Sequence, residues 1–172
     1  MELLSKNIMS SDLIVTHVEE LMSDAYVKLL KNDIRHLPVV DDAEKIVGII
    51  SDRDFKKAMW RFSDNEQRAT FDDEDVVGDF MSWPVKTITP DMGVITVAKR
   101  MVNEKVSAYL VVDNNRLVGI VTHEDLLQAF ISQAEENVDR KEEFLYAGVK
   151  DRGFAFRWVY NPQLGRFVSS HI

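Results

Sequence analysis

Short apolar runs and a stretch of helical spacing follow one another along the first half of the chain. Apolar residues recur every three or four positions from Leu21 to Leu30, which predicts an amphipathic helix. The apolar runs around it predict strands, and a polar turn joins the last two strands into a hairpin. Ser51 is expected to cap a second helix, whose first turn is acidic. The predicted elements are strands at residues 13–16, 34–40 and 45–50 and helices at residues 19–31 and from residue 52.

The second half of the chain repeats that order of elements. Pro90 suits the first turn of a helix, because its missing N–H would have no intrahelical partner there. Thr122 takes the capping position that Ser51 holds in the first half. The predicted elements are strands at residues 85–88, 106–112 and 116–121, a helix at residues 90–103 and a last helix from Thr122 to about Tyr146.

The two halves are copies of one another. Residues 47–55 recur as residues 118–126 at a shift of 71 positions, whereas residues 8–10 recur as residues 80–82 at a shift of 72. One residue is therefore missing before Gly119, and we expect the deletion in the turn at residues 114–116. A slip inside a strand would turn every side chain to the wrong face. The pattern indicates an internal duplication.

The duplication predicts the organisation of the chain. Each repeat has about 70 residues, a size at which isolated domains are marginally stable, so we expect the repeats to bury apolar faces against each other. The segment between them is expected to be a solvated linker, with a divalent-ion site at residues 72–75 as the alternative. The predicted parts are a first repeat at residues 1–60, an acidic linker at 61–75, a second repeat at 76–131, and a helical extension with an aromatic tail at 132–172.

The tail belongs to neither repeat. Two aromatic and apolar stretches, residues 154–160 and 166–169, flank the turn signal at residues 161–165, which predicts a β-hairpin. An open aromatic hairpin would be prone to aggregate, so we expect it to be covered. A second subunit and the body of the same chain remain alternative partners for it.

Composition narrows the functional class. The chain has 45% hydrophobic and 29% charged residues, as soluble globular proteins do. It contains no cysteine, which excludes disulfides, thiol catalysis and Cys-ligated zinc. The net charge of −8 argues against binding a nucleic-acid backbone. No apolar run is long enough to span a bilayer and no signal peptide is evident, so we expect a cytoplasmic protein.

The repeated strand–helix junction carries the candidate chemistry. In each copy a hydroxyl stands three residues before an aspartate, as Ser51 with Asp54 and as Thr122 with Asp125, so both side chains share one face of the helix start. Such a carboxylate can accept hydrogen bonds from the two hydroxyls of a ribose. The free N–H groups of the helix start favour a phosphate. The alternative is that these residues only cap helices.

The span from about Ile8 to Phe130 resembles a tandem pair of cystathionine-β-synthase (CBS) domains. The matching residues are Met9-Ser10, 37–41 and 48–54 in the first copy, and Met81-Ser82, 110–113 and 119–125 in the second. The resemblance implies an α+β fold in which two β-α-β-β-α repeats pack as a pseudo-twofold pair, here with a C-terminal β-hairpin extension. It also implies two clefts that bind adenosyl ligands such as AMP, ADP, ATP or S-adenosylmethionine.

The family's binding pattern can be carried onto this sequence. The hydroxyl–aspartate pairs would hold the ribose, and strand residues at the start of each repeat would line the clefts. The backbone around the residues before the first-repeat proline, and around their counterparts in the second repeat, would frame the base. The ligand-binding residues implied in this way are Thr16, Arg35, His36, Leu37, Pro38, Ser51, Arg53, Asp54, Ser107, Ala108, Tyr109, Thr122, His123 and Asp125.

The two clefts are not expected to be equal. If each repeat builds its own site, the first offers Arg35, His36 and Arg53 to a phosphate, and the planar fork of an arginine suits that group. The second has Leu110 in place of the proline and Glu124 in place of Arg53. We therefore expect a phosphorylated ligand in the first site, and a less charged ligand or none in the second.

The sequence predicts a regulatory protein rather than an enzyme. The four histidines lack the paired spacing of zinc sites and no nucleophile motif is evident, so we expect neither a catalytic cofactor nor a metal. We expect a homodimer that senses an adenine nucleotide or S-adenosylmethionine and signals to an unknown effector protein. The alternative is a CBS-pair scaffold whose clefts bind nothing and which acts through dimerisation. A nucleotide-modifying enzyme is the third hypothesis.

Overall fold

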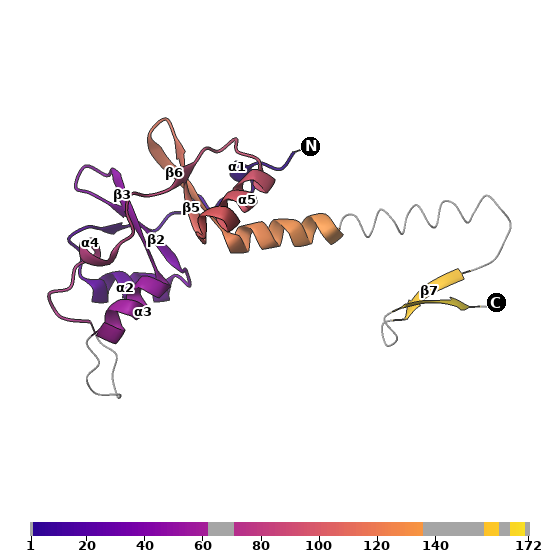
Figure 1. Cartoon of the computed structure of the whole chain (residues 1–172), viewed down its shortest axis with the longest axis horizontal. Coiled ribbons are helices and arrows are strands. Elements are labelled where there is room, and N and C mark those ends of the chain that lie inside the picture. Colours follow the sequence, from indigo (N-terminus) through magenta and orange to yellow (C-terminus); the bar gives the residue numbers. More distant parts are fainter. Residues whose placement is uncertain (1, 62–70, 136–156, 162–165, 171–172) are drawn as a thin grey trace. The chain divides into compact units, whose positions relative to one another are not determined.

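A computed structural model describes residues 2–61, 71–135, 157–161 and 166–170. The chain divides into two compact units, Met1–Leu126 and Leu127–Ile172. The first unit holds the first repeat and the second repeat as far as the start of its last helix, and the two repeats lie next to each other (Figure 1). The first repeat consists of β1 (Thr16–His17), α2 (Met22–Lys31), β2 (His36–Val40), β3 (Ile46–Ser51) and α3 (Asp52–Arg61). The second consists of β4 (Thr87–Ile88), α5 (Val94–Glu104), β5 (Ala108–Asp113), β6 (Arg116–Thr122) and a helix whose described part covers residues 123–135.

Each repeat contains a three-stranded sheet of the same topology. The orders are β1-β2-β3 and β4-β5-β6, with the first pair parallel and the second antiparallel in both. Both hairpins carry a register shift at matched positions, after Val39 and after Val111. The predicted α+β duplication is therefore confirmed.

The hairpin turns explain the missing residue of the second repeat. Asn114 and Asn115 link β5 to β6 in a two-residue turn, and both have positive φ, 47° and 62°. Asparagine tolerates this conformation, which matches the twist of a hairpin. The first hairpin uses a longer turn in which the Asp41 carboxylate accepts backbone N–H bonds from Ala43 and Lys45, both at 2.9 Å. The deletion lies in the turn, as predicted.

Each repeat has its own apolar core. The first is built around Met22, Leu37 and Phe55, and the second around Val97, Tyr109 and Val121, all of them buried. The partly buried Phe71 closes the first core, with its ring 5.6 Å from that of Tyr26 and 6.0 Å from that of Phe55. Phe71 lies within the predicted linker, and these contacts fix it to the first repeat.

The short helix before each repeat packs on the other repeat. The segment of α1 (Ser5–Ile8) bonds to the second repeat, where Leu4 bridges Gly93 and Ser10 bridges Ile120. The segment of α4 (Val77–Phe80) does the same on the first repeat, through bridges from Val76 to Leu21 and from Ser82 to Ile49. This exchange ties the two repeats together through their backbones.

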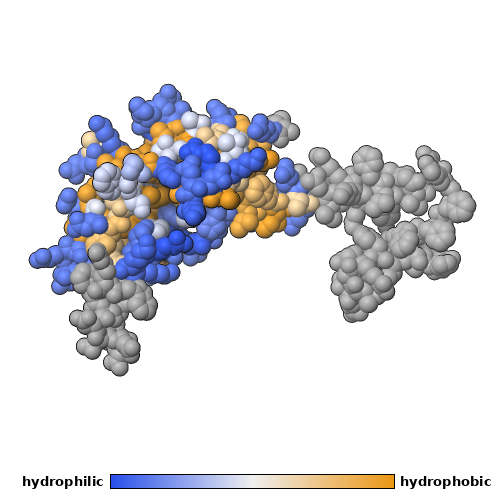
Figure 2. Space-filling model, viewed as in Figure 1, coloured by the Kyte–Doolittle hydropathy of each residue, from blue (hydrophilic) through white to orange (hydrophobic). Residues whose placement is uncertain are grey.

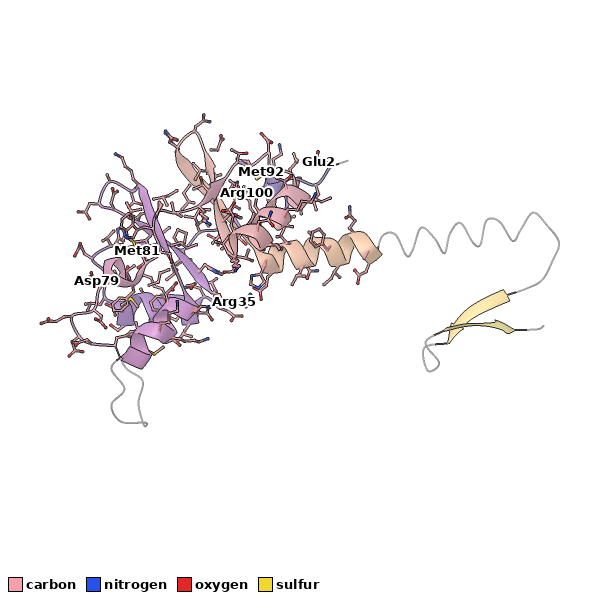
Figure 3. All side chains as sticks on the ribbon, in the orientation of Figure 1. Glu2, Arg35, Asp79, Met81, Met92 and Arg100 are labelled. Atoms are coloured by element: carbon pink, nitrogen blue, oxygen red, sulfur yellow. The ribbon has the colours of Figure 1, made fainter. Side chains whose placement is uncertain are left out.

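We call residues 4–10 and 76–82 the exchanged segments. One methionine in each of them explains why a glycine is repeated in the strand that it contacts. A Cβ on Gly119 would lie 2.5 Å from Sδ and 2.9 Å from Cγ of Met9, and one on Gly48 would meet Met81 in the same way. Only a residue without a side chain lets the methionine approach the strand so closely. Figure 3 shows Met81 on the first repeat.

The exchange also corrects the predicted starts of two helices. α2 begins at Met22 and α5 at Val94, so the prediction that Pro90 lies in the first helical turn is wrong. The Pro90 carbonyl instead accepts a 2.9 Å bond from the Lys6 N–H of the exchanged segment. The first backbone N–H of each helix donates to a carbonyl of the segment that leads into α4 or α1. The N–H of Met22 donates to the Asp75 carbonyl at 2.8 Å, and the N–H of Val94 donates to the Leu3 carbonyl at 2.9 Å.

The last unit is described only in part. Its strands β7 (Arg157–Asn161) and β8 (Arg166–Ser170) pair antiparallel, which confirms the predicted hairpin. The expected end of the last helix near Tyr146, the stretch 62–70 of the linker and the partner of the aromatic tail lie outside the described residues. Within the described ranges, no helix is long and apolar enough to cross a membrane.

The helix at residues 123–135 has an apolar stripe. Leu127, Phe130 and Ile131 are exposed on it, at spacings of three and four residues. The stripe contributes to the apolar patch that this helix shows in Figure 2, whereas hydrophilic residues cover much of the remaining visible face.

Candidate functional site

The two hydroxyl–aspartate pairs have the same geometry. Asp54 Oδ2 accepts hydrogen bonds from the backbone N–H of Ser51 at 3.0 Å and from its hydroxyl at 2.6 Å. Asp125 Oδ2 accepts the same pair of bonds from Thr122, at 2.7 Å and 2.8 Å. Both aspartates are half-buried at helix starts. Each carboxylate holds its own helix start through Oδ2, and its Oδ1 can still accept hydrogen bonds. Oδ1 of Asp54 lies 4.0 Å from Nζ of Lys57.

Two clefts lie at these pairs, and each is lined by both repeats. The Ser51 cleft, of about 510 Å³, is lined from the first repeat by Ser51, Arg53 and Asp54, and from the second by Lys105, Ser107 and Ala108. The Thr122 cleft, of about 210 Å³, is lined from the second repeat by Thr122, Glu124 and Asp125, and from the first by Arg35, His36 and Pro38.

Each cleft takes residues from both repeats, so the condition on which the expected ranking of the clefts rested is not met. Arg35 and Pro38 lie in the Thr122 cleft, whereas Ser107 and Ala108 lie in the Ser51 cleft. The start of the middle strand of each sheet faces the hydroxyl–aspartate pair of the other repeat. The offset of 71 or 72 residues between the repeats identifies equivalent positions, but it does not show which cleft each position lines.

Arg35 and Glu124 meet across the Thr122 cleft. Their side chains form an ion pair that joins the first repeat to the second, with 42% and 65% of the side-chain surfaces exposed. In Figure 3, Arg35 lies on the side of the first repeat that faces the second repeat. Glu124 therefore neutralises the arginine that was expected to serve a phosphate in the other cleft.

His36 lines both clefts. Its Nε2 lies 2.9 Å from the hydroxyl of Ser107, which makes it a second contact between the repeats. Burial lowers the pKa of His36 below its usual value, and the carboxylate of Asp52 opposes this only in part. The imidazole is therefore neutral at pH 7. His123 lines the Ser51 cleft and holds the Ser107 carbonyl through its backbone N–H at 3.0 Å.

The side chains of three of the predicted binding residues do not line the two clefts. The side chains of Leu37 and Tyr109 are fully buried in the two cores, and neither residue lines one of the two clefts. Thr16 is also buried, and its hydroxyl donates to Glu20 at 2.9 Å. Strand alternation explains this, because neighbours of a cleft residue along a strand face the core.

Sequence analysis did not single out four charged residues that line the clefts. Lys57 and Lys105 line the Ser51 cleft, and Asp12 and Asp33 line the Thr122 cleft. Asp33 and Lys105 each follow a helix in a left-handed conformation, with φ of 51° and 53°. Comparing the repeats at the shift of 72 would have paired these two positions.

Comparison with known proteins identifies the family. Residues 5–61 and 77–132 each match the CBS domain. The chain belongs to the CBS domain family. A CBS domain-containing protein of Dictyostelium discoideum is 33% identical over 139 residues, which cover 78% of this chain and 96% of that protein. The recognition of a CBS pair from the sequence is therefore confirmed.

Other relatives are larger proteins that contain a CBS pair. An L-aspartate semialdehyde sulfurtransferase of Methanocaldococcus jannaschii is 35% identical over 128 residues, which cover 74% of this chain but 23% of the enzyme. A homoserine O-acetyltransferase of Methanosalsum zhilinae is 32% identical over 122 residues, which cover 70% of this chain and 22% of the enzyme. The chain thus spans about a quarter of the length of these two enzymes.

Solved structures share the fold. The CBS domain pair of protein MJ0100, in complex with 5′-methylthioadenosine and S-adenosyl-L-methionine, matches with a TM-score of 0.68 and 33% identity and covers 77% of this chain and 99% of that one. A CBS-domain protein of Agrobacterium tumefaciens matches with a TM-score of 0.65 at 20% identity, covers 73% of this chain and 92% of that one, and supports the fold alone. In the described part of the chain, no group of three or more histidine, aspartate or glutamate side chains could hold a metal ion.

Proposed function

We propose that this CBS pair is a regulatory module that binds adenosyl ligands, such as AMP, ADP, ATP or S-adenosylmethionine, in the Ser51 and Thr122 clefts. The observation that carries the proposal is the pair of matched hydroxyl–aspartate contacts, each of which lines a cleft between the repeats. The CBS pair of MJ0100, which is 33% identical, binds two adenosyl compounds and supports the same ligand class here.

The chemistry of the Ser51 cleft suits a nucleoside. Asp54 uses Oδ2 for its own helix start and can accept the two ribose hydroxyls with Oδ1. The volume of the Ser51 cleft, about 510 Å³, falls within the range of roughly 300–1,000 Å³ that is typical of small-molecule sites. Ile49 and Val106 give the cleft apolar surface against which a base can pack.

The signal would be a change in how the repeats pack. Because each cleft takes side chains from both repeats, a ligand that touches both sides favours one relative arrangement over another. A homodimer and an effector protein in the cytoplasm complete the proposal, since a change in packing needs a partner to detect it. We assign no reaction and no catalytic cofactor to this chain.

A scaffold without ligands is the second candidate. Two observations favour it: the aspartates already satisfy their own helix starts, and the Arg35–Glu124 pair spans the smaller cleft. A scaffold would keep its fold and its oligomeric state whatever nucleotide is added.

Calorimetry separates the two candidates. The purified protein is titrated in parallel with AMP, ATP and S-adenosylmethionine, next to Asp54→Ala, Asp125→Ala and the control Asp73→Ala, which removes an equal charge from an exposed position outside the clefts. A sensor binds at least one ligand with saturation and loses it in one aspartate variant but not in the control. A folded protein that binds none of the three is a scaffold.

A further inference from the structure

The two clefts carry opposite charges at matched positions. Asp33 and Lys105 stand 72 residues apart and have the same left-handed backbone after equivalent helices, yet one lines the Thr122 cleft and the other the Ser51 cleft. Arg53 and Glu124 stand 71 residues apart at equivalent helix starts and are divided between the clefts in the same way. At both pairs of positions the cation lines the Ser51 cleft and the carboxylate lines the Thr122 cleft.

The other charged residues follow the same division. Lys57 adds a third cation to the Ser51 cleft, where Asp54 is the one acidic residue of the lining. Asp12 and Asp125 bring the acidic residues of the Thr122 cleft to four, against Arg35 alone among lysines and arginines. Two clefts related by duplication therefore differ in the sign of their charge.

Two of the three cations of the Ser51 cleft, Arg53 and Lys105, are free to meet a ligand in the described part of the chain. Within the described part of the chain, neither Arg53 nor Lys105 forms an ion pair, and Lys57 lies 4.0 Å from Asp54. Arg35, in contrast, is paired with Glu124. An arginine that is free to approach a phosphate can donate two hydrogen bonds to it. A phosphate in the Thr122 cleft would meet the carboxylates of Asp12 and Asp33 and an arginine that is already paired.

We infer that the two clefts sort adenosyl ligands by charge. The Ser51 cleft takes a ligand with a phosphate, with Arg53 and Lys105 as the residues that select it. The Thr122 cleft rejects that phosphate through Asp33 and Glu124 and takes an uncharged adenosyl compound. This inference rests on the proposed function and deepens it, because one chain then holds two ligands of different charge at once.

The test uses two probes that share their nucleoside and differ in one phosphate, AMP and adenosine. The full-length protein is titrated with each, and with adenosine in the presence of saturating AMP. AMP is expected to bind one site per chain, with an affinity that falls as salt is added. Arg53→Gln with Lys105→Gln should weaken AMP by about tenfold or more, because each loses a charge-assisted contact. Adenosine should still bind the AMP-saturated protein.

A second variant is designed to gain binding, because misfolding cannot explain a gain. Asp33→Asn with Glu124→Gln removes two carboxylates from the Thr122 cleft and frees Arg35, so a second AMP site per chain is expected. Equal binding of AMP to both clefts of the unmodified protein, or no response to either double substitution, would overturn the sorting while the proposed function stands. If neither AMP nor adenosine binds the folded protein, the proposed function fails and the inference fails with it.

Discussion

The guanidinium of Arg35 pairs with the carboxylate of Glu124 and so connects the start of β2 in one repeat to the helix start after β6 in the other. Both side chains are substantially exposed, with 42% and 65% of their surfaces open to solvent. Ion pairs of this kind contribute about 0–1 kcal/mol, since water screens them. The pair therefore matters for the charge of the Thr122 cleft and adds little to the stability of the fold.

Glu124→Gln should leave the free energy of unfolding within about 1 kcal/mol of the original value. Urea denaturation followed by circular dichroism measures this. Lys6→Gln is a matched control, because Lys6 forms another exposed ion pair between the exchanged segment and the second repeat, at 2.6 Å from Asp91. A loss of more than about 2 kcal/mol in Glu124→Gln alone would show that the pair holds the repeats together.

Gly119 and Met9 should be energetically coupled. Gly119→Ala forces a Cβ against Met9 and should cost about 1–3 kcal/mol, and Met9→Ala should cost a comparable amount through lost packing. The double variant should be more stable than the sum of the two losses predicts, by at least about 0.5 kcal/mol. Gly48→Ala with Met81→Ala repeats the cycle in the first repeat. Strict additivity in both cycles would contradict the close approach of the exchanged segments.

Leu37 should matter to the fold and not to the ligand. Its side chain is fully buried in the first core, so Leu37→Ala should cost about 2–5 kcal/mol of unfolding free energy. Leu30→Ala makes the same chemical change on a side chain that is 59% exposed and should cost far less. If Leu37→Ala left stability unchanged but weakened the binding of AMP, Leu37 would be a cleft residue after all.

His36 should make stability depend on pH below its ordinary pKa. Its pKa in the folded protein is lowered by burial, so the unfolded chain takes up a proton first as the pH falls through about 6.5. Stability from this group is thus complete above that pH and is lost as the pH falls toward the lowered pKa. His36→Gln should flatten the stability profile between about pH 7.5 and 5.5 relative to the original protein. An unchanged profile would mean that His36 titrates like an exposed histidine.

The sequence predicted the fold because the duplication and the apolar pattern are local signals. The strands around Val39 and Val111, the hairpins and the hydroxyl–aspartate pairs were predicted from short windows and occur where expected. Strand alternation alone did not decide which residues near Pro38 face the core. Leu37 and Tyr109 were grouped with the ligand-binding residues through their backbones, and the structure places their side chains in the two cores.

The pairing of the repeats could not be deduced from the same signals. Which repeat α1 packs on depends on contacts between residues far apart, such as Met9 with Gly119. For the same reason the sequence assigned Arg35 to the cleft of Asp54, whereas it lies opposite Asp125. The opposite charges of Asp33 and Lys105 can be related to ligand binding only when it is known which cleft each residue lines.

The most direct test is a titration of the ¹⁵N-labelled protein with AMP, followed through its backbone amide signals in two-dimensional NMR spectra. The account predicts saturable shifts of Ser51, Asp54 and Lys105, with Thr122 and Asp125 little changed. Saturable shifts confined to Thr122 and Asp125 would leave a nucleotide sensor but reverse the assignment of the clefts. A well-dispersed spectrum in which neither group of signals moves would contradict the proposal that this CBS pair binds an adenine nucleotide.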